Sequence, residues 1–335
     1  ADSGDSHDDA NFSRLSANSA IMRLSNHVQW VQEMINDGDK VLRAADADVP
    51  ANIAFADKIF ETKVELAVRD TKKFYDEMAF KQVLKTACFD LQAARDEYRL
   101  LAGDKLMRRD LVERFIEVFT VMLMPIIPHT SEHVWRNILK RSGSVCRDAR
   151  FPVADESKID ISALKGAKYI DDTLAAIRQR MKGEAKKKVA NKPNVGHIFV
   201  ADKYADWQLS VLALVRKVYE TEGIAGLQNT GAIAKQMGQT IQEKRVLNTA
   251  MSFLTFKINE MKTTGDASVL SDSLPFNEKE YLEANKQLII DQGFQGAIKQ
   301  VQVWTVSDPN APEEKSKVNA MPSKPIISLM YDASL

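Results

Sequence analysis

The chain has 335 residues, of which 44% are hydrophobic and 27% are charged, a composition typical of folded globular proteins and not of disordered chains. The 46 basic residues balance the 46 acidic ones, so only local clusters of charge can indicate a nucleic-acid partner. The length predicts about two domains.

The 2 cysteines are too few for a disulfide framework, which favours a reducing, intracellular setting. No apolar run reaches the roughly 18 residues of a membrane span. The first residue is Ala1, not Met, which suggests a piece of a longer protein.

The first part of the chain is predicted to be helical. Hydrophobic residues recur there every three or four positions, the spacing of one buried helix face. In the first segment this pattern places Phe12, Leu15 and Ile21 toward a core, and in the third it does the same for Cys88. Breaks rich in Gly, Pro and Asp separate the segments, as in antiparallel helices joined by short connections. The predicted helices cover residues 8–36, 52–77, 80–101, 105–124 and 130–141.

The fourth and fifth helices meet at a corner that contains two prolines. The fourth helix is apolar nearly all round, which predicts a place in the middle of the bundle, and Pro125 ends it. The fifth helix is predicted to hold Glu132 in its first turn and Lys140 and Arg141 in its last turn, where these charges suit the helix dipole. Gly143 is predicted to end it.

Beyond the bundle the sequence mixes helices with strands. One further helix is predicted over 161–182, and 207–219, 230–237, 242–261 and 278–291 are also predicted to be helical; strands are predicted over 197–201, 298–306 and 326–331, the last two paired with each other. Residues 178–192 contain seven basic residues and one Glu, which predicts a linker or mobile arm. The predicted fold is mainly α: an antiparallel helical bundle over 1–177, a basic linker or arm over 178–194 and a smaller α+β domain over 195–335.

The corner contains the pattern Pro128-His129-x-x-Glu132-x-x-Trp135. This pattern resembles a signature of the helical anticodon-binding domain of class I aminoacyl-tRNA synthetases for leucine, isoleucine, valine and methionine. In such a corner Pro128 fixes the start of the helix, Glu132 meets the helix N-terminus, and Trp135 points inward. These four residues are therefore interpreted as a structural signature, not as catalytic groups.

Four further segments resemble leucyl-tRNA synthetases of the archaeal and eukaryotic cytosolic type. The resemblance is good to about residue 220 and looser beyond it. Two alternatives remain: the same region of an isoleucyl- or valyl-tRNA synthetase, which the last two segments disfavour, and a stand-alone tRNA-binding or protein-interaction module derived from a synthetase. The four segments are residues 1–12, 28–34, 78–99 and 198–208.

The resemblance implies the tRNA-binding C-terminal half of a cytoplasmic leucine–tRNA ligase. The ATP-binding signatures of that family, of the His-Ile-Gly-His and Lys-Met-Ser-Lys-Ser types, do not occur in this sequence, and neither does its editing domain. We therefore expect no catalytic residue and no cofactor in this chain, which should be inactive alone, and we expect ATP and Mg²⁺ to bind the missing catalytic half. The implied partners are tRNA(Leu), the catalytic and editing domains of the same protein, and other synthetases or translation factors, with no membrane.

Clusters of Lys and Arg are the candidates for contact with RNA phosphates, against the alternative of ordinary solvated surface charge. Tyr204 and Trp207 could stack on an unpaired base, although their helical spacing is more typical of core residues. The candidate tRNA-binding residues are Lys81, Lys85, Arg136, Lys140, Arg141, Arg178, Arg180, Lys182, Lys186, Lys187, Lys188 and Lys192.

His129, Glu132 and His133 also match H-x-x-E-H, the inverted motif of some zinc peptidases. That motif fixes only three positions in five, so chance matches are common. The synthetase pattern explains Pro128, His129, Glu132 and Trp135 together and leaves His133 as a surface residue. We therefore expect no metal site, whereas a metallopeptidase would contain stoichiometric zinc.

Overall fold

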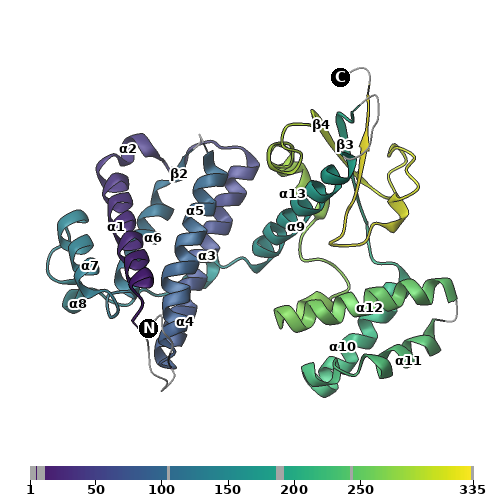
Figure 1. Ribbon diagram of the computed structural model, residues 1–335, viewed down its shortest axis with the longest axis horizontal. Helices are drawn as coiled ribbons and strands as arrows, with labels where there is room; N and C mark the ends of the chain where they lie inside the picture. The colour runs from purple at the N-terminus through teal and green to yellow at the C-terminus, as the bar shows by residue number, and fades with distance from the viewer. Residues whose placement is uncertain (1–4, 6–11, 104–105, 186–191, 242–243, 333–335) are drawn as a thin grey trace. The chain divides into compact units, whose positions relative to one another are not determined.

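The computed structural model describes residue 5 and residues 12–103, 106–185, 192–241 and 244–332. Helices dominate it, and two short sheets complete it, so the prediction of a mainly α chain with a smaller α+β part is confirmed (Figure 1). The chain divides into two compact units, Ala1–Ala167 and Lys168–Leu335. The boundary lies inside a helix, ten residues before the predicted end of the bundle at residue 177.

The first unit is a bundle of helices. Its third long segment begins as α4 and passes through a π-helical turn at Lys85–Asp90 into α5, and the segment after α7 is likewise π-helical, at Val134–Ile138. Two residues of β1 pair in parallel with two of β2. The elements are α1 (Arg14–Asn36), α2 (Gly38–Val41), β1 (Leu42–Arg43), α3 (Ala51–Asp76), α4 (Phe80–Leu84), α5 (Leu91–Ala102), β2 (Met107–Arg108), α6 (Arg109–Met122), α7 (Pro128–His133) and α8 (Val145–Asp148).

The core of the bundle forms around α6, as the apolar character of that helix predicted. Phe115 and Phe119 of α6 are buried and lie 5.7 Å apart between ring centroids. Phe60 of α3 stacks on Tyr98 of α5 at 4.5 Å. Cys88 is also buried in this core, so its predicted role is confirmed. Burial of such aromatic side chains is the main stabilising contribution to a bundle.

Only the second half of α1 reaches this core. The helix begins after Ser13, whose side chain accepts the N–H of Ser16, and His27, Trp30, Val31 and Met34 are its buried residues. The prediction that Phe12, Leu15 and Ile21 face a core is wrong, because their side chains are 82%, 81% and 62% exposed. Helical spacing shows which residues share a face, but it does not show whether another element covers that face.

The second unit contains a three-stranded sheet and two groups of helices. The sheet order is β4-β3-β5, with β3 parallel to β4 and antiparallel to β5. The predicted pairing of the last two strands with each other is wrong, because β3 lies between them. The elements are α9 (Ile161–Glu184), which begins in the first unit, β3 (Val195–Val200), α10 (Asp206–Gly226), α11 (Thr230–Thr240), α12 (Lys244–Thr264), α13 (Glu278–Ala284), α14 (Lys286–Leu288), the π turn Ile289–Gly293, β4 (Gln300–Thr305) and β5 (Ile326–Met330).

Two apolar cores stabilise this unit. One joins α10, α11 and α12 through residues such as Leu212, Ile233 and Phe253. The other packs Leu174 and Ile177 of α9 against the sheet and the segment after α13. All six residues of β3 are buried, which explains why this strand occupies the centre of the sheet.

Candidate nucleic-acid interface

The Pro-His-x-x-Glu-x-x-Trp residues fasten the turn that follows α7. Pro128 opens α7, as predicted. Glu132 does not meet the N-terminus of its own helix: its Oε2 accepts the Ser144 hydroxyl at 3.0 Å and the Val145 N–H at 2.9 Å, at the start of α8. Trp135 is half-buried, not directed into the core, and its indole N–H donates to the Ser142 carbonyl at 3.4 Å. The signature therefore stabilises the connection between α7 and α8.

This connection also displaces two of the candidate cations from the helix. The helical segment ends at Ile138, and Lys140 adopts a left-handed conformation with φ 54°. A left-handed residue commonly follows a helix C-terminus, because its N–H and the next one can bond the last free carbonyls; here Arg141 N–H donates to Trp135 O at 3.0 Å. The predictions that Lys140 and Arg141 occupy the last helical turn and that Gly143 ends the helix are therefore wrong.

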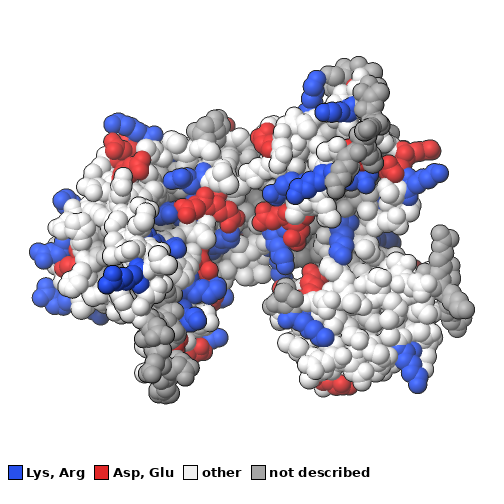
Figure 2. Space-filling model, in the orientation of Figure 1, with Lys and Arg blue, Asp and Glu red and all other residues white. Residues whose placement is uncertain are grey.

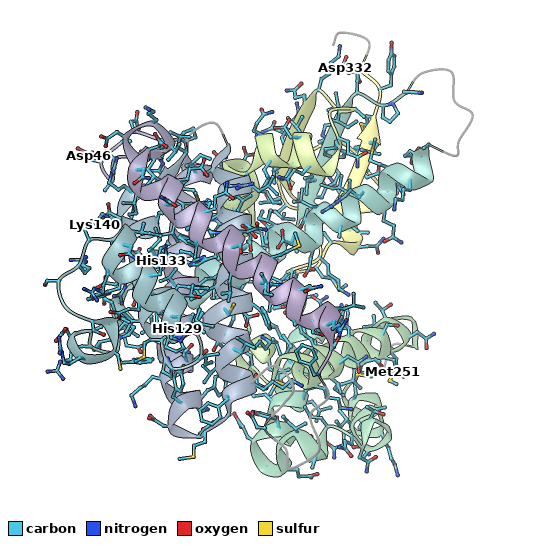
Figure 3. The ribbon with its side chains drawn as sticks, turned by 60° about the vertical axis from the view of Figure 1, so that its left-hand side comes forward. Asp46, His129, His133, Lys140, Met251 and Asp332 are labelled. Carbon is cyan, nitrogen blue, oxygen red and sulfur yellow. The ribbon has the colours of Figure 1, made fainter. Side chains whose placement is uncertain are left out.

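Arg136, Lys140 and Arg141 nevertheless form one basic group, which we call the corner cations. All three are exposed, and Arg136 lies 3.8 Å from Glu132. Basic side chains gather along the edge of the bundle formed by α7 and α8 (Figure 2). Lys140, His129 and His133 lie around α7 and the turn after it (Figure 3).

Two further candidates lie at the start of α4 and the π turn. Lys81 and Lys85 are both exposed. The Lys81 backbone N–H donates to the Asp5 carboxylate at 3.0 Å. The Lys85 ammonium lies 2.6 Å from Asp90, so its charge is partly compensated.

The remaining candidates lie on the C-terminal part of α9 or between α9 and β3. The predicted linker begins inside a helix, because α9 continues to Glu184 and holds Arg178, Arg180 and Lys182 on its exposed surface. Arg178 donates to the carbonyl of Leu174 at 3.1 Å, and Arg180 lies 3.7 Å from Glu184. Lys192 is exposed just before β3, whereas Lys186, Lys187 and Lys188 lie outside the described residues.

Of the two aromatic candidates, Tyr204 is buried and Trp207 is partly buried. Tyr204 is 2% exposed and packs in the core of α10–α12. Trp207 is half-buried and meets Phe253 edge to face at 5.6 Å between ring centroids. The core interpretation is thus confirmed for Tyr204.

The H-x-x-E-H residues are used in other ways. His129 and His133 are exposed, and His133 Nδ1 lies 2.9 Å from the amide nitrogen of Asn137. Across the described ranges, no three His, Cys, Asp or Glu side chains are grouped as metal ligands would be. None of the described helices is long and apolar enough to cross a membrane.

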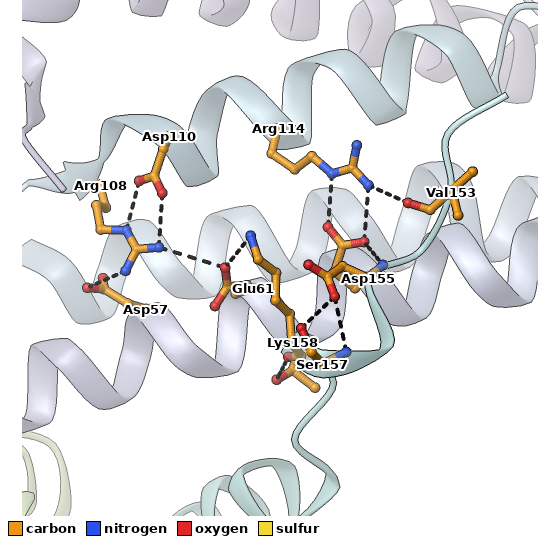
Figure 4. Close-up of polar contacts among 11 residues, drawn as sticks. Asp57, Glu61, Arg108, Asp110, Arg114, Val153, Asp155, Ser157 and Lys158 are labelled. Carbon is orange, nitrogen blue, oxygen red and sulfur yellow. Dashed lines mark hydrogen bonds and ion pairs between the residues drawn. The ribbon is translucent and has the colours of Figure 1, made fainter. Parts of the chain in front are cut away.

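A network of charged side chains, not predicted from the sequence, joins α3 to β2 and α6. Asp57, Glu61 and Glu65 lie four residues apart on α3 and face Arg108 and Arg114 (Figure 4). Asp57 also accepts bonds from Arg43 and from the Tyr98 hydroxyl, and burial together with this bond raises the pKa of Tyr98. The carboxylate spacing was visible in the sequence, but the arginine partners come from β1, β2 and α6, which the sequence does not place beside α3.

Known proteins are similar to this chain in sequence. A family model described as the anticodon-binding domain of tRNA ligase matches residues 57–195. The cytoplasmic leucine–tRNA ligase of Arabidopsis thaliana is 33% identical over 327 residues, which cover 92% of this chain and 29% of that protein. Over most of its length, the chain is therefore similar to leucine–tRNA ligases, and residues 57–195 match the anticodon-binding domain of tRNA ligase.

Other leucine–tRNA ligases show the same similarity. The cytoplasmic leucine–tRNA ligase of Pongo abelii is 32% identical over 97% of this chain and 27% of its own length. The putative cytoplasmic enzyme of Schizosaccharomyces pombe is 33% identical over 87% of this chain and 26% of its own length. The chain thus spans less than a third of the leucine–tRNA ligases that it matches.

The matched anticodon-binding domain extends from α3 to the first residue of β3. It includes the corner that begins at Pro128, the lysines Lys81 and Lys85, and the exposed surface of α9. Every candidate cation, from Lys81 to Lys192, lies within the matched range.

Proposed function

We propose that this chain is the tRNA-binding C-terminal portion of a leucine–tRNA ligase and that it positions tRNA(Leu) for ATP-dependent aminoacylation by a catalytic part of the full-length protein. The carrying observation is the similarity to cytoplasmic leucine–tRNA ligases over 87–97% of the chain. The named relatives favour leucine over isoleucine and valine. ATP and Mg²⁺ would bind the catalytic part, and the full-length enzyme would act in the cytoplasm.

The proposed mechanism is positioning by phosphate contact. Lys81, Lys140 and Lys182 are exposed, and their ammonium groups form no ion pair within the described residues, although Asp5 accepts the backbone N–H of Lys81; each could therefore replace counterions on an RNA backbone. By contrast, the charges of Lys85 and Arg180 are shared with Asp90 and Glu184. Such contacts carry no sequence information, but they fix the register of the RNA. If the acceptor end of the tRNA is held over the reactive centre, aminoacylation becomes faster because the reacting groups are already oriented.

Binding of the 335-residue chain to tRNA(Leu) tests this proposal. Affinity is measured at two salt concentrations and compared with that for a tRNA with a short variable arm. We expect tighter, salt-dependent binding of tRNA(Leu). Replacement of Lys81, Lys140 and Lys182 by Ala should lower the salt slope by about one per contact. The matched control is Lys72→Ala, an exposed lysine already paired with Asp76 at 2.6 Å. Failure to bind either tRNA would contradict the proposal.

A second measurement uses the full-length enzyme. The same three replacements should slow aminoacylation while ATP–pyrophosphate exchange, which needs no tRNA, keeps its rate. An equal loss in both reactions would show that the replacements damage the fold or the catalytic part, and the positioning role would then be wrong.

A further inference from the structure

A short strap, residues 321–325, connects the two apolar cores of the second unit. It leads directly into β5, whose Leu329 packs against the core formed by α9 and the sheet. At the start of the strap, Met321 packs against the core of the α10–α12 group. The Lys324 ammonium group lies 3.3 Å from the ring centroid of Phe256 on α12. The strap therefore ties the α10–α12 group to the sheet through side-chain contacts as well as through the chain.

Three hydrogen bonds close the backbone of the strap. Met321 N–H donates to the Lys324 carbonyl at 3.2 Å, and Lys324 N–H donates to the Met321 carbonyl at 2.8 Å. Between them Ser323 has φ 67°, a left-handed conformation that costs a residue other than glycine free energy and needs contacts to hold it. The Ser323 N–H donates to Oε1 of Glu278 at 3.0 Å. The other two strap residues are prolines, so these three bonds engage every N–H group of the strap.

The Glu278 carboxyl group that holds Ser323 is buried without a cation. Glu278 is the first residue of α13 and is 6% exposed. Among the described residues it forms no ion pair, and the ammonium group of Lys279 beside it pairs instead with Asp308 at 3.9 Å. Burial raises the pKa of Glu278 to about 7, although Tyr169 and the Ser323 N–H act in the opposite direction. This carboxyl group therefore changes its charge near neutral pH.

The other titratable groups around this carboxyl group supply no compensating charge. On α9, burial and then the negative charge of Glu278 raise the pKa of Tyr169, so its hydroxyl stays neutral. For Tyr204, just before α10, burial and the charges of Glu260 and Glu278 also raise the pKa. On α12, Lys257 pairs with Glu260 at 2.9 Å. An ionised Glu278 is therefore a buried charge surrounded by neutral groups, which is costly.

We propose that the strap is a pH-controlled latch, which stays closed while Glu278 is protonated and opens when Glu278 ionises. The protonated carboxyl group is buried at little cost and still accepts the Ser323 N–H. The ionised group gains water when the strap moves away, and the contacts of Met321 and Lys324 with the α10–α12 group are then lost. The pKa of Glu278 is about 7 with the strap closed and returns toward 4.5 with the strap open, so rising pH favours opening across this interval. The latch is independent of the tRNA contacts proposed above.

Hydrogen exchange of the three strap amides in the 335-residue chain tests the latch. The intrinsic exchange rate at each pH is divided by the observed rate, which gives a protection factor free of the chemical effect of pH. Between pH 6 and pH 8 the protection of these amides should fall about tenfold. The amides of β3 report unfolding of the whole unit and should stay better protected than the strap. Strap protection that does not change with pH, or that equals the protection of β3, would overturn the proposal.

Two variants on α13 separate the charge of Glu278 from its structural role. Glu278→Gln keeps the shape and the bond from Ser323 but cannot ionise, so the strap should stay protected at pH 8 and the tenfold fall should disappear. Glu283→Gln is the matched control, because it removes an exposed carboxylate from the same helix, and it should retain the fall. A fall that persists in Glu278→Gln would show that another group controls the strap, and the latch would then be wrong.

Discussion

Arg114 binds Glu65 through two parallel hydrogen bonds, from Nε to Oε1 at 2.9 Å and from Nη2 to Oε2 at 3.1 Å. The Glu65 side chain is 2% exposed and also accepts the backbone N–H of Asp155 at 2.9 Å. Arg114 in turn donates to the Val153 carbonyl at 2.9 Å. This pair therefore joins α3, α6 and the segment that leads to α9 (Figure 4).

Replacement of Arg114 by Met should lower the free energy of unfolding by about 3 kcal/mol, because it leaves the buried Glu65 carboxylate without its cation. Urea unfolding followed by far-ultraviolet circular dichroism measures the change. Arg147→Met is the control: its partner Asp148 is adjacent and the Arg147 side chain is 78% exposed, so this replacement should leave the free energy of unfolding almost unchanged. Similar losses in the two variants would contradict this account of the pair.

His27 should make the bundle sensitive to acid. Its pKa is about 3 in the folded chain and 6.5 when exposed, so below pH 6.5 the unfolded chain binds a proton that the folded chain does not. Stability from this group is therefore complete above pH 6.5 and falls as the pH drops toward 3, by up to ~1.4 kcal/mol per unit.

Urea unfolding at pH 7, 6 and 5 measures this dependence. His27→Phe should remove about 2 kcal/mol of the difference between pH 7 and pH 5. Replacement of the exposed His129 by Gln serves as the control and should retain the full dependence. An unchanged pH dependence in His27→Phe would show that His27 is not the group responsible.

Two glycines should respond to alanine in opposite directions. A Cβ on Gly196 of β3 would lie 2.9 Å from Cζ of the buried Phe294, so Gly196→Ala should destabilise the second unit by about 1–3 kcal/mol. A Cβ on Gly183 of α9 would meet nothing within 4 Å, and Gly183→Ala should stabilise by roughly 0.5–1 kcal/mol. Melting temperatures of the two variants check this. The same sign in both would mean that the contact with Phe294 does not limit the position.

The helices of the bundle could be predicted because their spacing and their environment agree. Phe115 and Phe119 lie on a helix that is apolar all round, and such a helix must be surrounded by others. Leu15 and Ile21 show where this reasoning fails, because spacing alone does not reveal the covering element. The pairing of β5 failed for a related reason: the identity of a neighbouring strand depends on contacts that are distant in the sequence.

The candidate interface was predictable in charge but not in geometry. The sequence shows that Lys81 and Lys85 are basic, but only the fold shows that Asp90 pairs with Lys85. Lys140 takes a backbone conformation typical of glycine, so its place outside the helix could not be inferred from spacing. His27 looked like one more residue on an amphipathic helix, and only the packing of Phe119 and Arg95 around it reveals its unpaired nitrogens.

The position of β3 has a consequence for synthesis on the ribosome. Both of its neighbours, β4 and β5, lie far downstream, beyond α10, α11, α12 and α13. A growing chain therefore presents β3 with both edges unpaired until β4 and β5 emerge, whereas the intervening helices can already pack on one another. An unpaired apolar strand invites aggregation, so this strand is where nascent-chain chaperones would act on the second unit.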